Sequence, residues 1–269
     1  MRREPSFGQG RAQAMILAAG RGARMRPLTD RCPKPLLEVH GKALMQWPME
    51  ALCRSGVAAV VVNTDWLGAQ IAGRFGACFE PATTHGRGQA GESAGRLRIV
   101  YSDEGRDFGG ALETAGGIIR ALPQLDEVFW LLAGDVYAPD FVFSDAAMQG
   151  FAASGKLAHI WLVPNPDHHP NGDFGLQESA DGSALALASA DPRYTYSTIG
   201  LYRRALFAPP YCPIPAGNPH GVRAALAPIL RTAMDRGEVS AQHYTGLWVD
   251  VGTPERLAQI NQRHRPTRP

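Results

Sequence analysis

The stretch AMILAAGRG, residues 14–22, indicates the fold of this 269-residue chain more directly than any other part of it. Its first six residues are apolar without alternation, which is typical of a strand buried on both faces of a parallel sheet. The glycines at positions 20 and 22 then predict a loop whose backbone can turn sharply and approach a ligand. Apolar residues at helical spacing over 42–55 and a second apolar run over 57–62 follow. The order strand, glycine loop, helix, strand predicts a parallel sheet with helical crossovers.

The rest of the chain continues this alternation and changes character near residue 155. Further strands are predicted at 97–101, 127–133, 159–163, 198–202 and 247–251, and further helices at 114–122, at 222–234 and from near Pro254. Because turn-rich stretches separate the later strands, we expect the second half to extend the sheet and to supply a lid. The predicted fold class is α/β, a Rossmann-like three-layer α/β/α sandwich with a mostly parallel mixed sheet.

The expected organisation is one domain over residues 14–260, between a flexible N-terminal extension over 1–13 and a tail over 261–269. Residues 82–95 are small, polar and glycine-rich without apolar periodicity, which predicts a mobile surface loop. No repeat of 20–50 residues is visible in the sequence.

Composition excludes several classes of protein. Hydrophobic residues are 45% of the chain and charged residues 19%, as in an ordinary globular protein. The net charge of +2 gives no overall field that would attract nucleic acid or an anionic membrane. The apolar runs are far shorter than the roughly 20 residues of a membrane-spanning helix, and no secretory signal is recognisable. Four scattered cysteines argue against a zinc site or a disulfide framework and favour a reducing cytoplasm.

The glycine loop is followed by positively charged residues at close spacing. Three arginines lie within six positions, at 21, 24 and 26, and successive backbone N–H groups of such a loop can hold an anion. Lys34 then stands between Pro33 and Pro35, which restrict the backbone on both sides of it. This arrangement favours a polyphosphate ligand, although a tight turn with solvated arginines has the same pattern. The spacing fits neither a P-loop nor a dinucleotide-binding motif.

Two aspartates lie in or directly after apolar runs of the sequence, where a carboxylate needs a specific role. Asp135 follows the apolar strand 127–133 and so projects at the carboxyl edge of the sheet, where parallel sheets bind ligands. Asp250 lies inside an apolar run, where a carboxylate needs a partner or a cation. A helix cap or a turn aspartate is the alternative interpretation of Asp135.

The string LAAGRGARMRPLT, residues 17–29, together with PKPL, residues 33–36, resembles the signature of the sugar-1-phosphate nucleotidylyltransferases. The resemblance implies the nucleotide-diphospho-sugar transferase type of fold, with a nucleotide-binding half over about 14–150 and a sugar-binding half over about 151–260. It implies a nucleoside triphosphate and a sugar 1-phosphate as substrates and Mg²⁺ as cofactor. The attacking phosphate is already an anion near neutral pH, so alignment and charge neutralisation can carry the reaction without a general base.

The resemblance also assigns residues to roles. The catalytic residues that it implies are Arg24, Lys34 and Asp135. The implied nucleotide-binding residues are Leu17, Ala18, Ala19, Gly20, Gly22, Arg24, Glu113, Thr114 and Gly116. The implied sugar-phosphate ligands are Lys34, Asp173 and Gly175, and the implied Mg²⁺ ligands are Asp135 and Asp250. From the sequence alone, Thr114 can equally be only a helix N-cap and Asp173 only a turn residue.

Five further strings are similar to the uridylyltransferases of this family that act on N-acetylmuramate 1-phosphate in bacterial cell-wall recycling. They are NTDWLG (63–68), YSxEG (101–105), LETxGG (112–117), GDFGL (172–176) and WVDVGT (248–253). The chain departs from this pattern at Ala115, in the longer loop 106–111 and at Thr198. Because the last two departures touch the expected sugar and base pockets, another hexose 1-phosphate, such as mannose with GTP or glucose with UTP or dTTP, remains the alternative substrate. A protein that only senses a nucleotide sugar is the alternative outside enzymes.

Two other features can be explained by a structural role as well as by ligand binding. Trp66 can stack on a substrate ring, but it can equally seal the top of the sheet. The adjacent His168 and His169 are placed between Asp167 and Pro170, so we do not expect them to bind zinc. A cytoplasmic monomer or weak homo-oligomer is expected, with small-molecule substrates as its partners.

Overall fold

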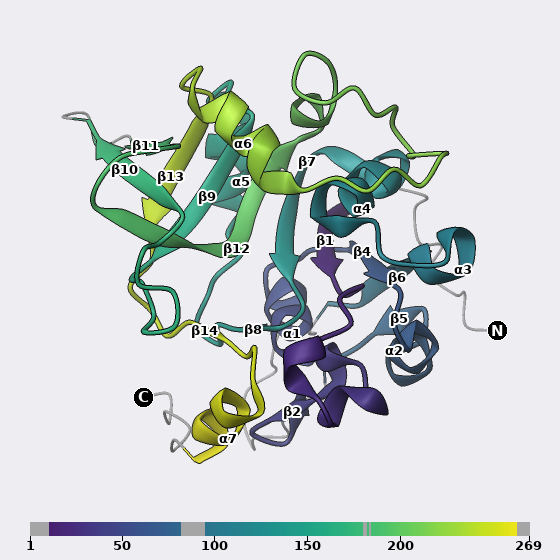
Figure 1. Cartoon of the computed structure of the whole chain (residues 1–269). Helices are drawn as coiled ribbons and strands as arrows, with labels where there is room; N and C mark the ends of the chain where they lie inside the picture. The colour runs from purple at the N-terminus through teal and green to yellow at the C-terminus, as the bar shows by residue number, and fades with distance from the viewer. Residues whose placement is uncertain (1–10, 82–94, 180–181, 183, 263–269) are drawn as a thin grey trace, which may run out of the picture.

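The computed structural model describes residues 11–81, 95–179, 182 and 184–262, and a ten-stranded sheet runs through them (Figure 1). The strand order is β10-β11-β13-β9-β12-β7-β1-β4-β6-β5. The strands are β1 (Ala12–Leu17), β4 (Ala59–Thr64), β5 (Cys78–Phe79), β6 (Leu97–Asp103), β7 (Leu125–Ala133), β9 (Ala158–Val163), β10 (Phe174–Glu178), β11 (Ala184–Leu187), β12 (Arg193–Arg203) and β13 (Val239–His243). Two small antiparallel pairs lie outside this sheet, β2 (Glu38–Val39) with β3 (Lys42–Ala43) and β8 (Val136–Tyr137) with β14 (Val249–Asp250).

The sheet combines a parallel and a largely antiparallel region. β7, β1, β4 and β6 are parallel neighbours, which is the arrangement that the strand and helix alternation of the first half predicts. β12 then pairs antiparallel with both β7 and β9, and so joins the second half to the first. The later strands thus extend the sheet, as expected, and the mixed sheet is confirmed.

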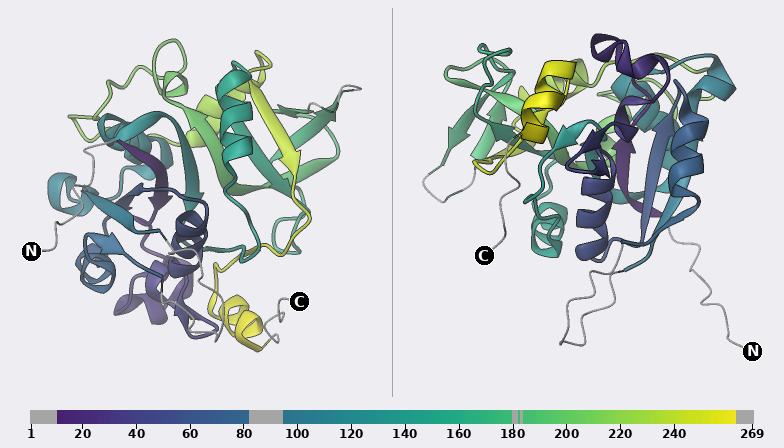
Figure 2. Two further views of the ribbon diagram at one scale, coloured as in Figure 1. Left: turned by 180° about the vertical axis from the view of Figure 1, so that it is seen from behind. Right: turned by 90° about the horizontal axis from the view of Figure 1, so that it is seen from below.

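Helices cover both faces of the sheet. The α-helices are α1 (Gln46–Arg54), α2 (Gly68–Phe75), α3 (Glu104–Phe108), α4 (Glu113–Ala121), α5 (Asp145–Ala153), α6 (Leu226–Met234) and α7 (Pro254–Gln262). Short 3₁₀ turns are η1 (Ala23–Met25), η2 (Leu28–Asp30), η3 (Lys34–Leu36), η4 (Leu122–Gln124) and η5 (Arg204–Phe207). Figure 1 is seen from the side of α4 and α6, and the left view of Figure 2 has α1 and α5 in front.

Alternating strand residues divide the core into two layers. Met15 of β1 belongs to the cluster beneath α4 and α6, whereas its neighbour Ile16 belongs to the cluster beneath α1, α2 and α5. The same division separates Leu131 from Leu132 in β7. A third, smaller cluster packs α7 against β2 and β8 through residues such as Ile260. The predicted three-layer α/β/α sandwich is therefore confirmed.

Several element ends differ from the sequence-based predictions. β1 begins at Ala12, so two residues assigned to the N-terminal extension are part of the sheet. The first helix begins at Gln46, with Pro48 in its first turn, because residues 42–43 pair as β3. The strand predicted over 247–251 contains only Val249 and Asp250, and the helix predicted from 222 begins at Leu226. The predicted loop at 82–95 lies almost entirely outside the described residues.

Among the described residues, no helix combines the length and the apolar character that crossing a membrane requires.

Candidate active site

A cavity of about 810 Å³ opens where β1 and β7 end, and most of the predicted site residues line it. The predicted residues on its wall are Leu17, Ala18, Ala19, Gly20, Gly22, Arg24, Lys34, Glu113, Thr114, Asp135 and Asp173. A smaller cavity of about 350 Å³ adjoins it and shares Arg24, Asp135, Tyr196 and Thr198 with it. Asp250 lines this second cavity. The structure thus brings together residues from both ends of the chain at one edge of the sheet.

The glycine loop is shaped by contacts with the residues that follow it. Gly22 has φ +63°, and a Cβ there would lie 3.1 Å from Thr29 Cγ2 and 3.2 Å from Lys34 Cβ. The Gly22 carbonyl accepts hydrogen bonds from the Met25 amide at 2.9 Å and from Thr29 Oγ1 at 2.8 Å. Position 22 therefore requires glycine both for its left-handed backbone and for the close approach of the Lys34 side chain.

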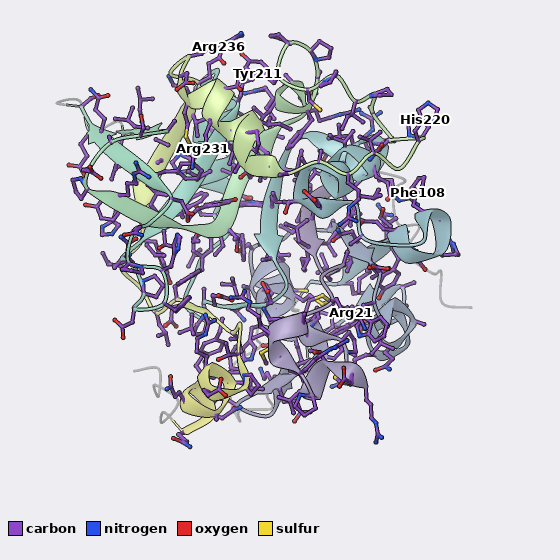
Figure 3. All side chains as sticks on the ribbon, in the orientation of Figure 1. Arg21, Phe108, Tyr211, His220, Arg231 and Arg236 are labelled. Atoms are coloured by element: carbon purple, nitrogen blue, oxygen red, sulfur yellow. The ribbon has the colours of Figure 1, made fainter. Side chains whose placement is uncertain are left out.

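Two arginines of the loop have different surroundings. Arg24 is exposed and lines both cavities. Arg21, labelled in Figure 3, stacks on the ring of Trp66 with 4.4 Å between the guanidinium carbon and the ring centroid. The Trp66 indole donates to the Thr29 carbonyl at 2.9 Å, and Trp66 lines neither cavity. Trp66 thus braces the loop from outside, which favours the structural interpretation of this residue.

Lys34 and the two aspartates meet at the boundary of the cavities. Lys34 begins η3 directly after Pro33, which has the extended φ of −65° and ψ of 141°. The Lys34 side chain is only 8% exposed, and its ammonium bonds to Asp135 Oδ2 and lies 3.8 Å from Asp250 Oδ1. The pairing of β8 with β14 sets Asp250 opposite Val136 and so brings the two aspartates to the same place. The predicted convergence of Asp135 and Asp250 is what the structure shows.

Asp250 has a second cation that sequence reasoning missed. Arg256, in the first turn of α7, donates through Nη1 to Asp250 Oδ2 at 2.8 Å and to the Asp250 carbonyl at 2.9 Å. Its Nη1 also lies 2.8 Å from Nε2 of His168, which is 3.6 Å from Asp250 Oδ2. Burial and the nearby Arg256 lower the pKa of His168, so the neutral imidazole can accept from the guanidinium. The position of Arg256 six residues after Asp250 does not by itself indicate this contact.

A buried polar network beneath the glycine loop was also missed as part of the site. Asn63, at the end of β4, accepts from the Ala18 amide at 2.8 Å and donates to Glu104 Oε1 at 2.8 Å. Glu104 accepts from the Leu112 amide at 2.7 Å and is fully buried. Burial raises the pKa of Glu104, although these hydrogen bonds oppose the shift. A Cβ at Gly117 would lie 2.5 Å from Glu104 Oε1, so this glycine makes room for the carboxylate.

Glu113 and Thr114 open α4 in a way the sequence did not predict. The helix begins at Glu113, which has φ +61°, and no side chain caps it, so the N-cap interpretation of Thr114 is wrong. The Ala224 carbonyl accepts instead from the amides of Ala115 and Gly116, at 2.9 and 3.1 Å. Thr114 is therefore free of a capping role and faces the cavity.

Two glycines predicted to bind ligands are placed elsewhere. Gly116 does not line either cavity, and a Cβ there would lie 2.6 Å from the Val222 carbonyl. Gly175 lies in β10, where a Cβ would be 2.7 Å from Ala190 Cβ. Both positions need glycine for close packing within the protein. Asp173 does reach the cavity, and its two oxygens contact the Tyr196 amide at 2.8 Å and His169 Nε2 at 3.1 Å.

Comparisons with known proteins identify the family of the chain. The family model described as nucleotidyl transferase matches residues 13–266. A Neisseria meningitidis serogroup B protein named N-acetylmuramate alpha-1-phosphate uridylyltransferase is 43% identical, over 92% of this chain and 96% of that protein. A Caulobacter vibrioides protein of the same name is 31% identical, over 90% and 92%. The solved inositol-1-phosphate CTP transferase from T. maritima aligns with a TM-score of 0.60 at 18% identity, over 94% of this chain and 98% of that one, and so supports the fold. The chain therefore belongs to the nucleotidyl transferase family.

Proposed function

We propose that this enzyme transfers the uridylyl group of UTP to N-acetylmuramate 1-phosphate and releases pyrophosphate. The observation that carries the proposal is the convergence of Lys34, Asp135 and Asp250 at the edge of a cavity lined by the glycine loop. The 43% identity to a protein with this named activity over almost its whole length supports the choice of substrates.

The residues of the site suit a reaction whose obstacle is electrostatic. The two substrates together carry roughly six negative charges near neutral pH, because each terminal phosphate has a second pKa near 6. Arg24 and Lys34 supply two cations beside the loop, where backbone N–H groups can also hold phosphate oxygens. The sugar phosphate oxygen attacks the α-phosphorus, the bond from the α-phosphorus to the bridging oxygen breaks, and pyrophosphate leaves. Lys34, held along Gly22, orients the phosphate that is transferred.

The two aspartates fit a Mg²⁺ site of the type used in phosphoryl chemistry. Carboxylate oxygens suit this hard cation, which takes one or two carboxylates and completes its coordination with phosphates and water. Asp135 and Asp250 are 34% and 24% exposed at their side chains, so both can reach a ligand in the cavities. When bound, the ion would neutralise charge on the phosphates. Within the described ranges, no cluster of three or more His, Cys, Asp or Glu residues offers a rival metal site.

The remaining assignments follow from the proposed substrates. Asp173 and Tyr196 come from the second half of the chain, and we assign the wall that they contribute to the sugar. Glu113 and Thr114 would lie beside the base. Thr198 has φ +61° and lines both cavities, so the departure at this position bears on which sugar is accepted. We place the reaction in the cytoplasm, in the recycling of cell-wall sugars.

The test is pyrophosphate release by the purified full chain with Mg²⁺ and a matrix of nucleoside triphosphates and sugar 1-phosphates. We expect the highest kcat/KM with UTP and N-acetylmuramate 1-phosphate. Asp135→Asn should abolish turnover, whereas Asp145→Asn, at an exposed position in α5, should not. A higher kcat/KM with mannose 1-phosphate and GTP, or with glucose 1-phosphate, would reassign the substrates. Absence of turnover with every pair would favour a nucleotide-sugar sensor.

A further inference from the structure

The acidic pair of the site is already neutralised by two side chains of the protein. Asp135 and Asp250 contribute two negative charges, and Lys34 and Arg256 contribute two positive charges. The Lys34 ammonium lies between the two carboxylates, in contact with Asp135 Oδ2 and 3.8 Å from Asp250 Oδ1. A divalent ion that binds both carboxylates must therefore contend with a cation at the same place.

The two cations differ in how firmly they are held. Arg256 makes contacts of 2.8 to 2.9 Å with the carboxylate and carbonyl of Asp250 and with His168. It belongs to α7, which is fixed by Asn261 through hydrogen bonds to the His40 amide at 2.7 Å and to a carbonyl of β2 at 3.0 Å. A Cβ at position 252 would lie 2.6 Å from Arg256 Nη2, so a glycine there gives the guanidinium its space. These contacts make Arg256 a fixed partner of Asp250.

Lys34 makes fewer such contacts: its ammonium bonds to Asp135 Oδ2 and lies 3.8 Å from Asp250 Oδ1. Its backbone is set by the flanking prolines and its side chain is 8% exposed, but its ammonium is the end of a four-methylene chain whose last torsions can change. It lines the large cavity together with Arg24 and the glycine loop, where the triphosphate of a nucleotide would lie. A small rotation of the side chain would move the ammonium from one anionic partner, the carboxylates, to another, the phosphates.

We propose that Lys34 and a divalent cation compete for Asp135 and Asp250, so that tight metal binding requires a nucleotide that draws the ammonium away. This inference rests on the proposed function in one respect, which is the identity of the nucleotide. Lys34 then has two successive partners, first the acidic pair and afterwards the phosphate that is transferred. Metal and nucleotide become mutually dependent ligands, because each gains affinity from the movement that the other favours.

The experiment measures Mn²⁺ binding to the full chain by electron paramagnetic resonance of the free ion, in the absence of any substrate. Removing the positive charge that lies against both carboxylates should strengthen binding by about tenfold or more, so Lys34→Met should bind Mn²⁺ correspondingly more tightly than the unchanged protein. Lys42→Met is the matched control, because the Lys42 ammonium pairs with Glu50 in a partly buried ion pair outside both cavities. It should leave Mn²⁺ affinity unchanged. Lys34→Gln repeats the test if the methionine variant does not fold.

A second arm tests the dependence on nucleotide. Addition of the non-hydrolysable α,β-methylene analogue of UTP should raise the Mn²⁺ affinity of the site in the unchanged protein by about tenfold or more, after correction for Mn²⁺ bound by the analogue alone. The same addition should raise it much less in Lys34→Met. Equal Mn²⁺ affinity of Lys34→Met and the unchanged protein would overturn the competition. If the competition holds but the UTP analogue has no effect and another nucleotide does, the inference stands and the proposed base is wrong.

Discussion

Replacing Asn63 should destabilise the protein more than its single side chain suggests, because two buried partners depend on it. Asn63→Ala removes the acceptor of the Ala18 amide and one of the donors to Glu104. Asn63 is 3% exposed and Glu104 is fully buried, so both bonds are made away from bulk water in the unchanged protein. A buried unpaired amide costs about 1–3 kcal/mol and a lost bond to a charged group about 1.5–3 kcal/mol, which gives about 2.5–6 kcal/mol in total.

The assay is urea unfolding at pH 7, followed by tryptophan fluorescence. Asn261→Ala is the control. Like Asn63, Asn261 makes two hydrogen bonds, but both are with backbone groups and they lie at the exposed surface of α7. The control should lose about 1 kcal/mol of unfolding free energy or less.

Asn63→Asp is a second variant: it keeps the acceptor for the Ala18 amide but places a carboxylate against Glu104. Since like charge raises carboxyl pKa values in the folded state, its stability should fall as the pH rises from about 5 to 8. A loss below about 1 kcal/mol for Asn63→Ala would refute the network as a support of the loop.

Three further predictions concern other parts of the structure. Arg256→Ala releases the carboxylate of Asp250, so kcat should fall by about 10–100-fold with little change in unfolding free energy; full activity would show that Asp250 needs no such support. Gly22→Ala forces a side chain onto a backbone with φ +63° and into the Lys34 side chain, so kcat/KM should fall while stability drops by about 1–2 kcal/mol, checked by steady-state kinetics and urea unfolding. Burial lowers the pKa of His159 from 6.5 to about 4, so the folded state binds fewer protons than the unfolded state between these values. Stability should therefore fall by about 3 kcal/mol as the pH drops from 6.5 to 4, and His159→Gln should lack this part of the pH dependence in unfolding titrations.

The parts of the fold that were predictable are those determined by local sequence. The uninterrupted apolar runs of β1 and β4 and the glycine loop between them identified the parallel region of the sheet, since such runs are buried on both faces. The meeting of Asp135 with Asp250 was also predicted, from the resemblance and from the position of Asp135 at a strand end. Their shared contact with Lys34 followed from neither.

The features that were missed depend on partners distant in the sequence. The N-terminus of α4 is satisfied by the Ala224 carbonyl, more than a hundred residues later, so the alternative interpretation of Thr114 as its N-cap is wrong. Gly116 and Gly175 are surrounded by packing contacts that only the folded chain reveals. Arg256 resembles any charged residue in the first turn of a surface helix until α7 is docked beside Asp250.

The most direct test of the reaction itself follows the phosphorus atoms of UTP. UTP labelled with radioactive phosphorus at either the α or the γ position is incubated with the full chain, N-acetylmuramate 1-phosphate and Mg²⁺, and the products are separated. We predict that the α label appears in the nucleotide sugar and the γ label in pyrophosphate. Transfer of the γ label to the sugar, or release of the γ label as inorganic phosphate without pyrophosphate, would contradict attack at the α-phosphorus.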